Sequence, residues 1–449
     1  MAFCLALPAG GHAEEFRWDA AGDRVSADLL DAPLKLVLQQ IRVATGWEVA
    51  VEPGVQHSIS TTFSGLKSGE ALPRLLRPAS FALIHRTNAA PRLLVFNTSL
   101  ERATEAVLEV AESDDPSVKR LEDEWIVTLK PGTDAEELAR KLGAKILGRI
   151  DDLGTYRLEF EDAAAAEAAR ALLDADESVQ SVDANYAIDR PAALQPLSFG
   201  GAALPKIRAA SGEAGGFLTI GIVDTAIRPP PGELAQLMLP GIAIAGEYSP
   251  TGAAPTHGEA MLNNVLNEVA AALGGAEAGF RVINADVFGS QEYTSTFQLG
   301  QGLVEVYNQG ASLINASIGS KSSSDWLNRI LDQLTAQGAV IVAPSGNTPD
   351  GLPTYPAAHP NVLAVTAMNP NGQLASYANF ASFVDVAMPG SSIVTLTGVP
   401  YFMAGTSVSA ARTTGVIAGF SLRSGQSLGA GLNFIRDTRG VQPAGQISP

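Results

Sequence analysis

Leu218-Thr219-Ile220-Gly221-Ile222-Val223-Asp224 is the stretch that decides the fold. It is an almost continuous apolar run that leads into a carboxylate. Strands buried on both faces of a parallel sheet have such runs, whereas half-exposed strands alternate between apolar and polar residues. The stretch therefore predicts a central parallel strand with an aspartate at its carboxyl end.

Apolar runs of the same kind recur further along the chain, with helical stretches between them. They are Val282–Val287, Ser312–Ser317, Ala339–Ala343 and Val362–Thr366. Strands that alternate with helices predict an α/β domain, here a doubly wound, mostly parallel sheet with helices on both faces. We expect this domain to span residues 207–449, with its chemistry at the carboxyl ends of the strands.

Four polar side chains stand at such strand ends or at helix starts: Asp224, His257, Asn347 and Ser407. Each has an ordinary alternative role, since Asp and Asn are common in turns and Ser commonly caps a helix. His257 begins a helical pattern, and Ser407 follows Gly405-Thr406 at the head of a buried one. A hydroxyl at a helix N-terminus lies where backbone N–H groups and the helix dipole stabilise negative charge. The set indicates a serine nucleophile with a base and an acid.

The chain order Asp, His, Asn, Ser resembles the subtilisin-like serine proteases, or subtilases. The resemblance covers about residues 207–425 and rests on Val223-Asp224-Thr225, His257-Gly258, Gly346-Asn347 and Gly405-Thr406-Ser407, supported by Asn315–Gly319, Tyr355–Ala357, Ala375–Asn379 and Val386–Gly390. It implies a catalytic triad of Asp224, His257 and Ser407, and an oxyanion hole that includes Asn347. It also implies substrate binding along Ser317, Ile318 and Gly319, and no cofactor; a structural calcium site is left open.

The sequence departs from the family pattern beside the catalytic residues. Glu259 stands where threonine is usual after His-Gly, and Ala226 and Arg228 replace a glycine and an aspartate. Val408-Ser409-Ala410-Ala411 replaces the usual Met-Ala-x-Pro. The Glu259 carboxylate either acts on His257 or points away from it. We expect these changes to affect rate and specificity more than the type of chemistry.

An acidic module precedes the α/β domain. Residues 101–190 carry 11 basic and 23 acidic residues, within a chain of 449 residues and net charge −17. A β-α-β-β-α-β order is predicted over 122–188, with helices at 133–142 and 163–175; the first would begin with a capping box of Thr133 and Glu136. This order resembles the inhibitory prodomain of subtilases; a generic ferredoxin-like domain is the alternative. The Pro-, Ala- and Gly-rich residues 189–206 are predicted to be a linker and cleavage region.

A first small α+β module is predicted over 16–100. Helices are expected at 30–45 and 68–76, and strands at 47–51, 58–63, 81–85 and 92–96. The order, with Ala32-Pro33-Leu34 and Ala44-Thr45-Gly46-Trp47, resembles the short N-terminal domain of secretins and TonB-dependent receptors. That resemblance implies docking to another envelope protein of a Gram-negative-type cell; an unrelated α+β module is the alternative.

Residues 1–13 resemble the end of a secretory signal peptide that lacks its charged start; a plain apolar tail is the alternative. A signal would make the protein secreted or periplasmic. The acidic net charge disfavours binding to nucleic acid. The sequence has no run of about 18 consecutive apolar residues, so it predicts no membrane span. Cys4 is the single cysteine, which excludes intrachain disulfides and cysteine metal sites.

Two functions fit these observations. The first is a serine endopeptidase made as a self-processing precursor, with protein or peptide substrates and its own prodomain as a partner in cis. The second is an inactive subtilase-fold scaffold of the cell envelope. The presence of all four site residues favours the enzyme.

Overall fold

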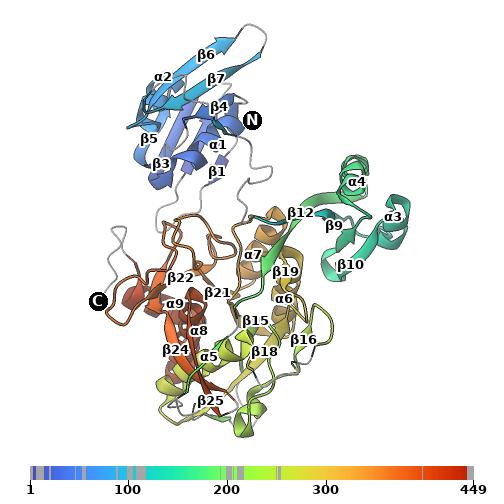
Figure 1. The fold of residues 1–449 in the computed structure, drawn as a ribbon, viewed down its shortest axis with the longest axis vertical. Coiled ribbons are helices and arrows are strands. Elements are labelled where there is room, and N and C mark those ends of the chain that lie inside the picture. The colour runs from blue at the N-terminus through green and yellow to red at the C-terminus, as the bar shows by residue number, and fades with distance from the viewer. Residues whose placement is uncertain are drawn as a thin grey trace. The chain divides into compact units, whose positions relative to one another are not determined.

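The computed structural model describes residues 4–6, 15–19, 22–45, 47–52, 57–86, 89–98, 105–107, 118–192, 194–198, 205, 207–209, 217–248, 250, 254–396 and 398–441. The chain divides into two compact units, Met1–Asp115 and Pro116–Pro449 (Figure 1). The second unit contains both the acidic module and the large α/β domain.

The first unit holds two four-stranded sheets and two helices. One sheet has the order β1 (Cys4–Ala6), β2 (Glu15–Asp19), β3 (Arg24–Pro33), β5 (Ser58–Leu66). The other has the order β6 (Ser80–Arg86), β7 (Ala89–Phe96), β4 (Glu48–Val51), β8 (Glu105–Val107), so this module extends past residue 100. Helices α1 (Leu34–Thr45) and α2 (Ser68–Leu75) contribute Val37, Leu38, Ile41 and Leu72 to its core.

One helix start in this unit was predicted wrongly. The helical spacing placed it at residue 30, but residues 30–33 end strand β3, and α1 begins at Leu34, directly after Pro33. The residue before a proline disfavours the helical conformation, which explains why the helix cannot include Ala32. Of residues 1–13, only Cys4–Ala6 are described, as strand β1 paired with β2, and the signal peptide stays a prediction.

The acidic module has the predicted β-α-β-β-α-β order. It consists of β9 (Arg120–Leu129), α3 (Ala135–Leu142), β10 (Lys145–Ile150), β11 (Thr155–Glu159), α4 (Ala163–Ala175) and β12 (Val179–Asp189). The closing strand β12 pairs with β9 and has two register shifts along its length. The predicted capping box is wrong by one position, because Asp134, not Thr133, accepts the Glu137 N–H at the start of α3.

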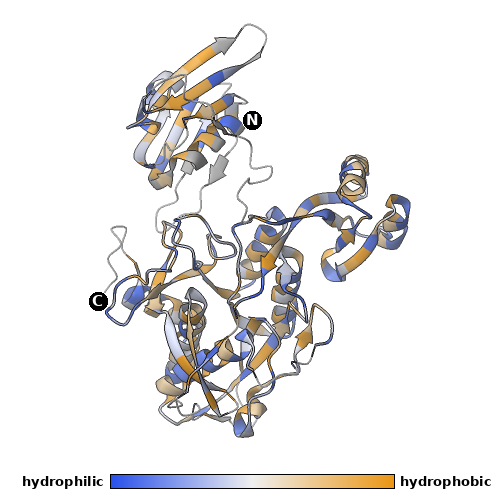
Figure 2. Cartoon of the chain, viewed as in Figure 1, coloured by the Kyte–Doolittle hydropathy of each residue, from blue (hydrophilic) through white to orange (hydrophobic). Residues whose placement is uncertain are grey.

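The large domain is built on a seven-stranded sheet whose pairings are all parallel. Its order is β16 (Ile242–Ala243), β18 (Phe280–Asp286), β15 (Leu218–Asp224), β20 (Ala311–Ala316), β21 (Val340–Pro344), β22 (Leu363–Met368), β23 (Val386–Pro389). Figure 2 shows apolar residues concentrated in its strands. This is the fold class predicted from the apolar runs.

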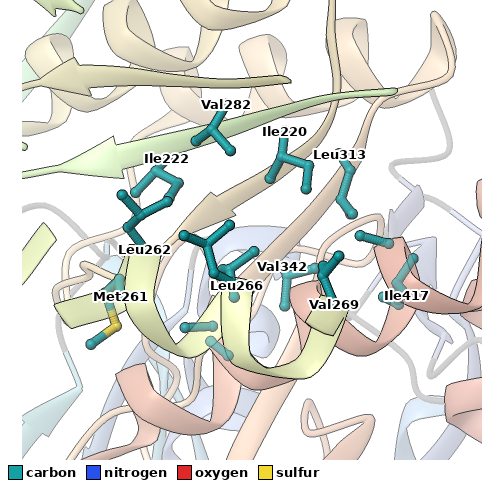
Figure 3. Close-up of a cluster of buried hydrophobic side chains, with 14 of the residues drawn as sticks. Ile220, Ile222, Met261, Leu262, Leu266, Val269, Val282, Leu313, Val342 and Ile417 are labelled. Carbon is teal, nitrogen blue, oxygen red and sulfur yellow. The ribbon is translucent and has the colours of Figure 1, made fainter. Parts of the chain in front are cut away.

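Helices cover both faces of this sheet. Successive apolar side chains of each strand point to opposite faces, so each face needs a layer of helices to bury it. Ile220, Ile222 and Val282 pack on one face against α5 (His257–Leu273), α8 (Thr406–Ser424) and α9 (Leu428–Arg439). Figure 3 shows Leu262, Leu266 and Val269 of α5 in this cluster, with Ile417 of α8. Val223, Ile283 and Ile314 pack on the other face against α6 (Thr296–Asn308) and α7 (Asp325–Ala336).

Short strands complete the second unit. A hairpin of β24 (Ser391–Leu396) and β25 (Val399–Ala404) leads into α8, and β13 (Gln195–Pro196) pairs with β25. Strand β19 (Tyr293–Ser295) pairs with β12 of the acidic module, and β14 (Arg208–Ala209) pairs with β17 (Glu277–Ala278). The linker after the acidic module is therefore tied to the large domain at β25.

Candidate active site

Asp224 and His257 are in direct contact at the carboxyl end of the sheet. Asp224 is the last residue of β15 and is fully buried, and His257 is the first residue of α5. The Nδ1 atom of His257 lies 2.9 Å from both carboxylate oxygens of Asp224. A carboxylate in this position holds the imidazole orientation and stabilises its charged form.

The turn after Asp224 and the start of α5 fit closely together. The Thr225 hydroxyl accepts the Gly258 N–H at 2.8 Å. A Cβ atom at position 258 would lie 2.5 Å from the Thr225 carbonyl oxygen, so only glycine fits without a shift. This close approach, made possible by His-Gly, places His257 beside Asp224.

Ser407 is the second residue of α8 and is half-buried. Its Oγ donates to the Ser317 carbonyl oxygen at 3.1 Å, and the Ser317 hydroxyl donates to the Ser407 carbonyl oxygen at 3.2 Å. Among the described residues, no hydrogen bond joins Ser407 to His257. Both line one pocket of about 300 Å³, and catalytic hydrogen bonds often form only when substrate binds.

Asn347 lines the same pocket and is oriented by the residue before Ser407. Its Oδ1 atom accepts the Thr406 N–H at 2.8 Å and the Thr406 hydroxyl at 3.0 Å. Because Oδ1 accepts both bonds, the other end of the amide is Nδ2, which is a hydrogen-bond donor. In the described part of the chain Nδ2 has no hydrogen-bond partner, so it is available to an oxyanion.

Ser317, Ile318 and Gly319 follow strand β20, and Ser317 is hydrogen-bonded to Ser407. Ile318 is buried, and a Cβ at position 319 would lie 2.7 Å from the Tyr355 carbonyl oxygen. None of the three lines the pocket that contains His257, Asn347 and Ser407. Their role in substrate binding stays a prediction.

Two departures from the family pattern form one ion pair. Glu259 Oε1 accepts from Arg228 Nε at 2.5 Å, and Oε2 accepts from Arg228 Nη2 at 2.8 Å. Glu259 also closes a capping box with Thr256 at the start of α5. The hydrogen bonds that Arg228 donates to Glu259 raise the pKa of Arg228. The Glu259 carboxylate is therefore bound to Arg228 and to the helix start, which was one of the two predicted alternatives.

The structure adds a segment that the sequence did not assign to the site. Pro191, Ala192, Leu194 and Gln195 of the linker line the pocket together with His257 and Ser407. Upstream, the Arg190 N–H donates to the Glu292 carbonyl oxygen at 2.9 Å; downstream, Gln195 pairs with Phe402 of β25. The side chains of Pro and Ala have no polar groups, so the sequence of this linker does not indicate which residues it contacts.

The described residues contain neither a metal-binding cluster nor a helix that could span a membrane. No group of three or more His, Cys, Asp or Glu side chains among them is arranged to hold a metal ion. No helix in the described ranges has the length and apolar character needed to cross a bilayer.

Two families of known proteins match parts of this chain. Residues 240–421 match the subtilase family, and residues 109–185 match the fervidolysin N-terminal prodomain. The first match contains His257, Asn347 and Ser407, while Asp224 lies upstream of it. The assignment of Asp224 therefore rests on its sequence motif and on its contact with His257.

Individual relatives cover parts of the chain. Thermitase of Thermoactinomyces vulgaris is 29% identical over 217 residues, which are 46% of this chain and 76% of thermitase. M-protease of Shouchella clausii (strain KSM-K16) is 31% identical over 161 residues, 35% of this chain and 41% of M-protease. The chain thus spans less than half the length of M-protease.

Two solved structures share the fold. A serine-to-alanine mutant of the epidermin leader peptide processing serine protease of Staphylococcus aureus aligns with a TM-score of 0.55 and 15% identity, over 70% of this chain and 92% of that one. Fervidolysin of Fervidobacterium pennivorans aligns with a TM-score of 0.54 and 17% identity, over 70% and 56% of the two chains. The chain therefore joins a subtilisin-like α/β domain, which matches the subtilase family, to a module that matches a fervidolysin-type prodomain.

Proposed function

We propose that this protein is a serine endopeptidase of the subtilisin type, made as a precursor that cleaves itself. The observation that carries the proposal is the buried Asp224–His257 contact beside a pocket that Ser407 and Asn347 also line. The family matches support the same reaction class.

The proposed mechanism gives each of these groups a distinct role. Ser407 Oγ attacks the carbonyl carbon of the scissile bond, and His257 takes its proton and later gives it to the leaving amine. Asp224 keeps the imidazole oriented and stabilises the imidazolium. The oxyanion accepts from Asn347 Nδ2 and from the Ser407 N–H; one such donor typically contributes about 3–4 kcal/mol to lowering the barrier. Ser317, Ile318 and Gly319 are proposed to bind the substrate backbone.

The position of the linker supports self-cleavage within residues 191–194. Arg190 is bound upstream by Glu292, and Gln195 pairs downstream with Phe402, so the described residues between them lie at the pocket of Ser407. The described members, Pro191, Ala192 and Leu194, all line that pocket. This narrows the cleavage region predicted over 189–206.

Mass spectrometry of wild-type and Ser407→Ala protein, both made in a host without other proteases, tests this proposal. We expect the wild type to break between residues 191 and 194, and the variant to stay intact. A fluorophosphonate probe should label Ser407 in the processed wild type. Identical fragments from both proteins would contradict self-cleavage, and absence of labelling would favour the inactive scaffold.

We also propose that the enzyme acts outside the cytoplasm, in the periplasm or medium of a Gram-negative-type cell, and that the first unit docks to an envelope protein. The apolar residues 1–13 and the order of elements in residues 16–100 support this. Cell fractionation with crosslinking tests it: recovery of the protein in the cytoplasm alone would contradict both parts.

A further inference from the structure

The guanidinium of Arg190 occupies a site made for a cation, immediately before the linker enters the pocket. Arg190 Nε donates to the Gln291 carbonyl oxygen and Nη2 donates to the Gly289 carbonyl oxygen, each at 2.7 Å. The guanidinium carbon lies 5.0 Å from the centre of the Phe288 ring. Two carbonyl acceptors and an aromatic face are suited to a planar cation, and a neutral side chain would lose these interactions.

A buried carboxylate lies in the loop that supplies these acceptors. Asp286 ends β18, next to Asp224 in the sheet, and is 5% exposed. Its Oδ1 accepts the N–H groups of Phe288 and Gly289 at 3.1 and 3.0 Å, which shapes the loop. Its Oδ2 is buried and has no hydrogen-bond partner among the described residues.

The charges of Asp286 and Arg190 act on each other. Burial raises the pKa of Asp286, the two backbone N–H groups lower it, and the positive charge of Arg190 lowers it further. Burying a carboxylate is costly unless an opposite charge compensates it. A cation in this position therefore stabilises ionised Asp286, and ionised Asp286 attracts a cation.

We propose that this arginine cage (the Gly289 and Gln291 carbonyls, the Phe288 ring and the Asp286 carboxylate) is a substrate subsite for a basic residue. The inference rests on the proposed function, because Arg190 would enter the cage as part of the enzyme's first substrate, its own linker. A self-cleavage between residues 191 and 194 makes Arg190 the second to fourth residue before the broken bond. Once the prodomain leaves, the cage is open to an arginine at the same place in other chains.

Arginine is favoured over lysine by the shape of the cage. The guanidinium presents several N–H donors in one plane and stacks on aromatic rings, whereas the lysine ammonium is a compact and strongly hydrated charge. The two carbonyls and the ring of Phe288 use both properties of the guanidinium. The cage thus predicts a graded preference of arginine over lysine over a neutral side chain.

Synthetic peptides of residues 184–200 test the proposal on the self-processed full chain. Three peptides carry arginine, lysine or citrulline at the position of Arg190; citrulline keeps the shape of arginine without its charge. We expect kcat/KM for the arginine peptide to exceed that of the citrulline peptide by roughly tenfold to a hundredfold, because hydrogen bonds to charged groups contribute about 1.5–3 kcal/mol. The lysine peptide should lie between them.

A charge-matched pair of variants locates the effect. Asp286→Asn should reduce the ratio of arginine to citrulline cleavage several-fold. Glu277→Gln removes an exposed carboxylate of β17, before the start of β18, whereas Asp286 ends that strand; this control should leave the ratio unchanged. Equal rates for the arginine and citrulline peptides, or a ratio unaffected by Asp286→Asn, would overturn the cage. Failure of the proposed function is a different result: the wild type would cleave none of the peptides and would not react with the fluorophosphonate, which overturns both inferences.

Discussion

At the scale of single residues, the orientation of His257 depends on one buried carboxylate. Asp224→Asn keeps the shape of Asp224 but removes its charge and favours the wrong imidazole tautomer. We expect kcat to fall by about 10⁴-fold with little change in KM. Steady-state kinetics on a peptide substrate, with circular dichroism as a check of folding, measure this. A folded variant that retains more than a tenth of the activity would contradict the assigned role of Asp224.

The ion pair of Arg228 and Glu259 gives a prediction about stability. Glu259 is buried, so Arg228→Met should lower the free energy of unfolding strongly, by about 3–5 kcal/mol if the pair acts as a buried one. Glu259→Thr in addition should recover much of this loss, since no charge is then left unpaired. Thermal denaturation in a Ser407→Ala background avoids self-digestion. Additive losses in the double variant would show that the two residues are not coupled.

Asp286 should make stability depend on pH. Its pKa is higher in the folded protein than in the unfolded chain, chiefly because of burial, so the folded state holds the proton more tightly. Stability is therefore lost as pH rises from the ordinary carboxyl pKa of about 4 to the raised value in the fold. Asp286→Asn should match the wild type in acid and exceed its stability at pH 7.

Chemical denaturation of Ser407→Ala protein with and without Asp286→Asn, at pH 3.5 and pH 7, measures this difference. A variant that is less stable at pH 7 would show that the carboxylate stabilises the fold. A stabilising role in the fold would then be enough to account for a carboxylate at position 286, without a role in binding a substrate cation.

The sequence predicted the four site residues that lie together in the structure, but not the contacts around them. Asp224, His257, Asn347 and Ser407 could be named because each follows a strand or begins a helix in a short motif. The role of Glu259 could not be determined, because its partner Arg228 is 31 residues away in the chain. The cage was missed for a different reason: two of its acceptors are backbone carbonyls, which every residue type has.

At the scale of elements, several hydrogen bonds join the acidic module to helix α6, and those of the Asn185 amide are the buried ones. Asn185 Oδ1 accepts from the Phe297 N–H and the Thr296 hydroxyl at the start of α6. Asn185 Nδ2 donates to Glu124, which is paired with Arg157. Asn185→Leu leaves the helix N–H and part of the Glu124 charge without a partner, which costs about 1–3 kcal/mol.

We expect this variant to release the cleaved module about 5- to 150-fold more readily. Size-exclusion chromatography after self-cleavage, at a series of dilutions, measures how much module stays bound. Asp183→Asn is the matched control: it removes the charge that pairs with Arg329, whose side chain is half exposed and keeps access to water, while the Asp183 side chain is 10% exposed, so we expect a smaller effect than for Asn185→Leu. Equal release from the two variants would mean that Asn185 does not hold the module.

Strands and helices with a clear period were predictable, and their ends were less so. The alanine-rich helix was predicted at 163–175, and α4 covers these residues. The start of α1 was not, because Leu30 continues an apolar helical period while the backbone around Pro33 is extended. At α3, Thr133 and Asp134 are both good caps, and only the path of the chain decides between them.

At the scale of the whole molecule, the linker is held on both sides of the pocket by its own chain. Such an intramolecular substrate is present at a high effective concentration, whatever the protein concentration. Self-cleavage should therefore be first order, with a half-time unchanged over a hundredfold dilution. Quantified gel bands after dilution from denaturant measure this, with inactive Ser407→Ala chains mixed in as reporters. Cleavage of those reporters at a rate that rises with enzyme concentration would indicate a reaction between molecules.

Removal of the acidic module also has a consequence for solubility. Strand β12 pairs with β19 through Ala187–Ser295, Ile188–Thr294 and Asp189–Tyr293, so the small sheet continues into the large domain. Once β12 leaves, β19 becomes an unprotected edge strand, whose free N–H and C=O groups are a template for any extended chain. Such an edge can pair with the same edge of a second molecule. In the proposed maturation, the form without the acidic module is therefore the one most prone to self-association, because β12 no longer covers this edge.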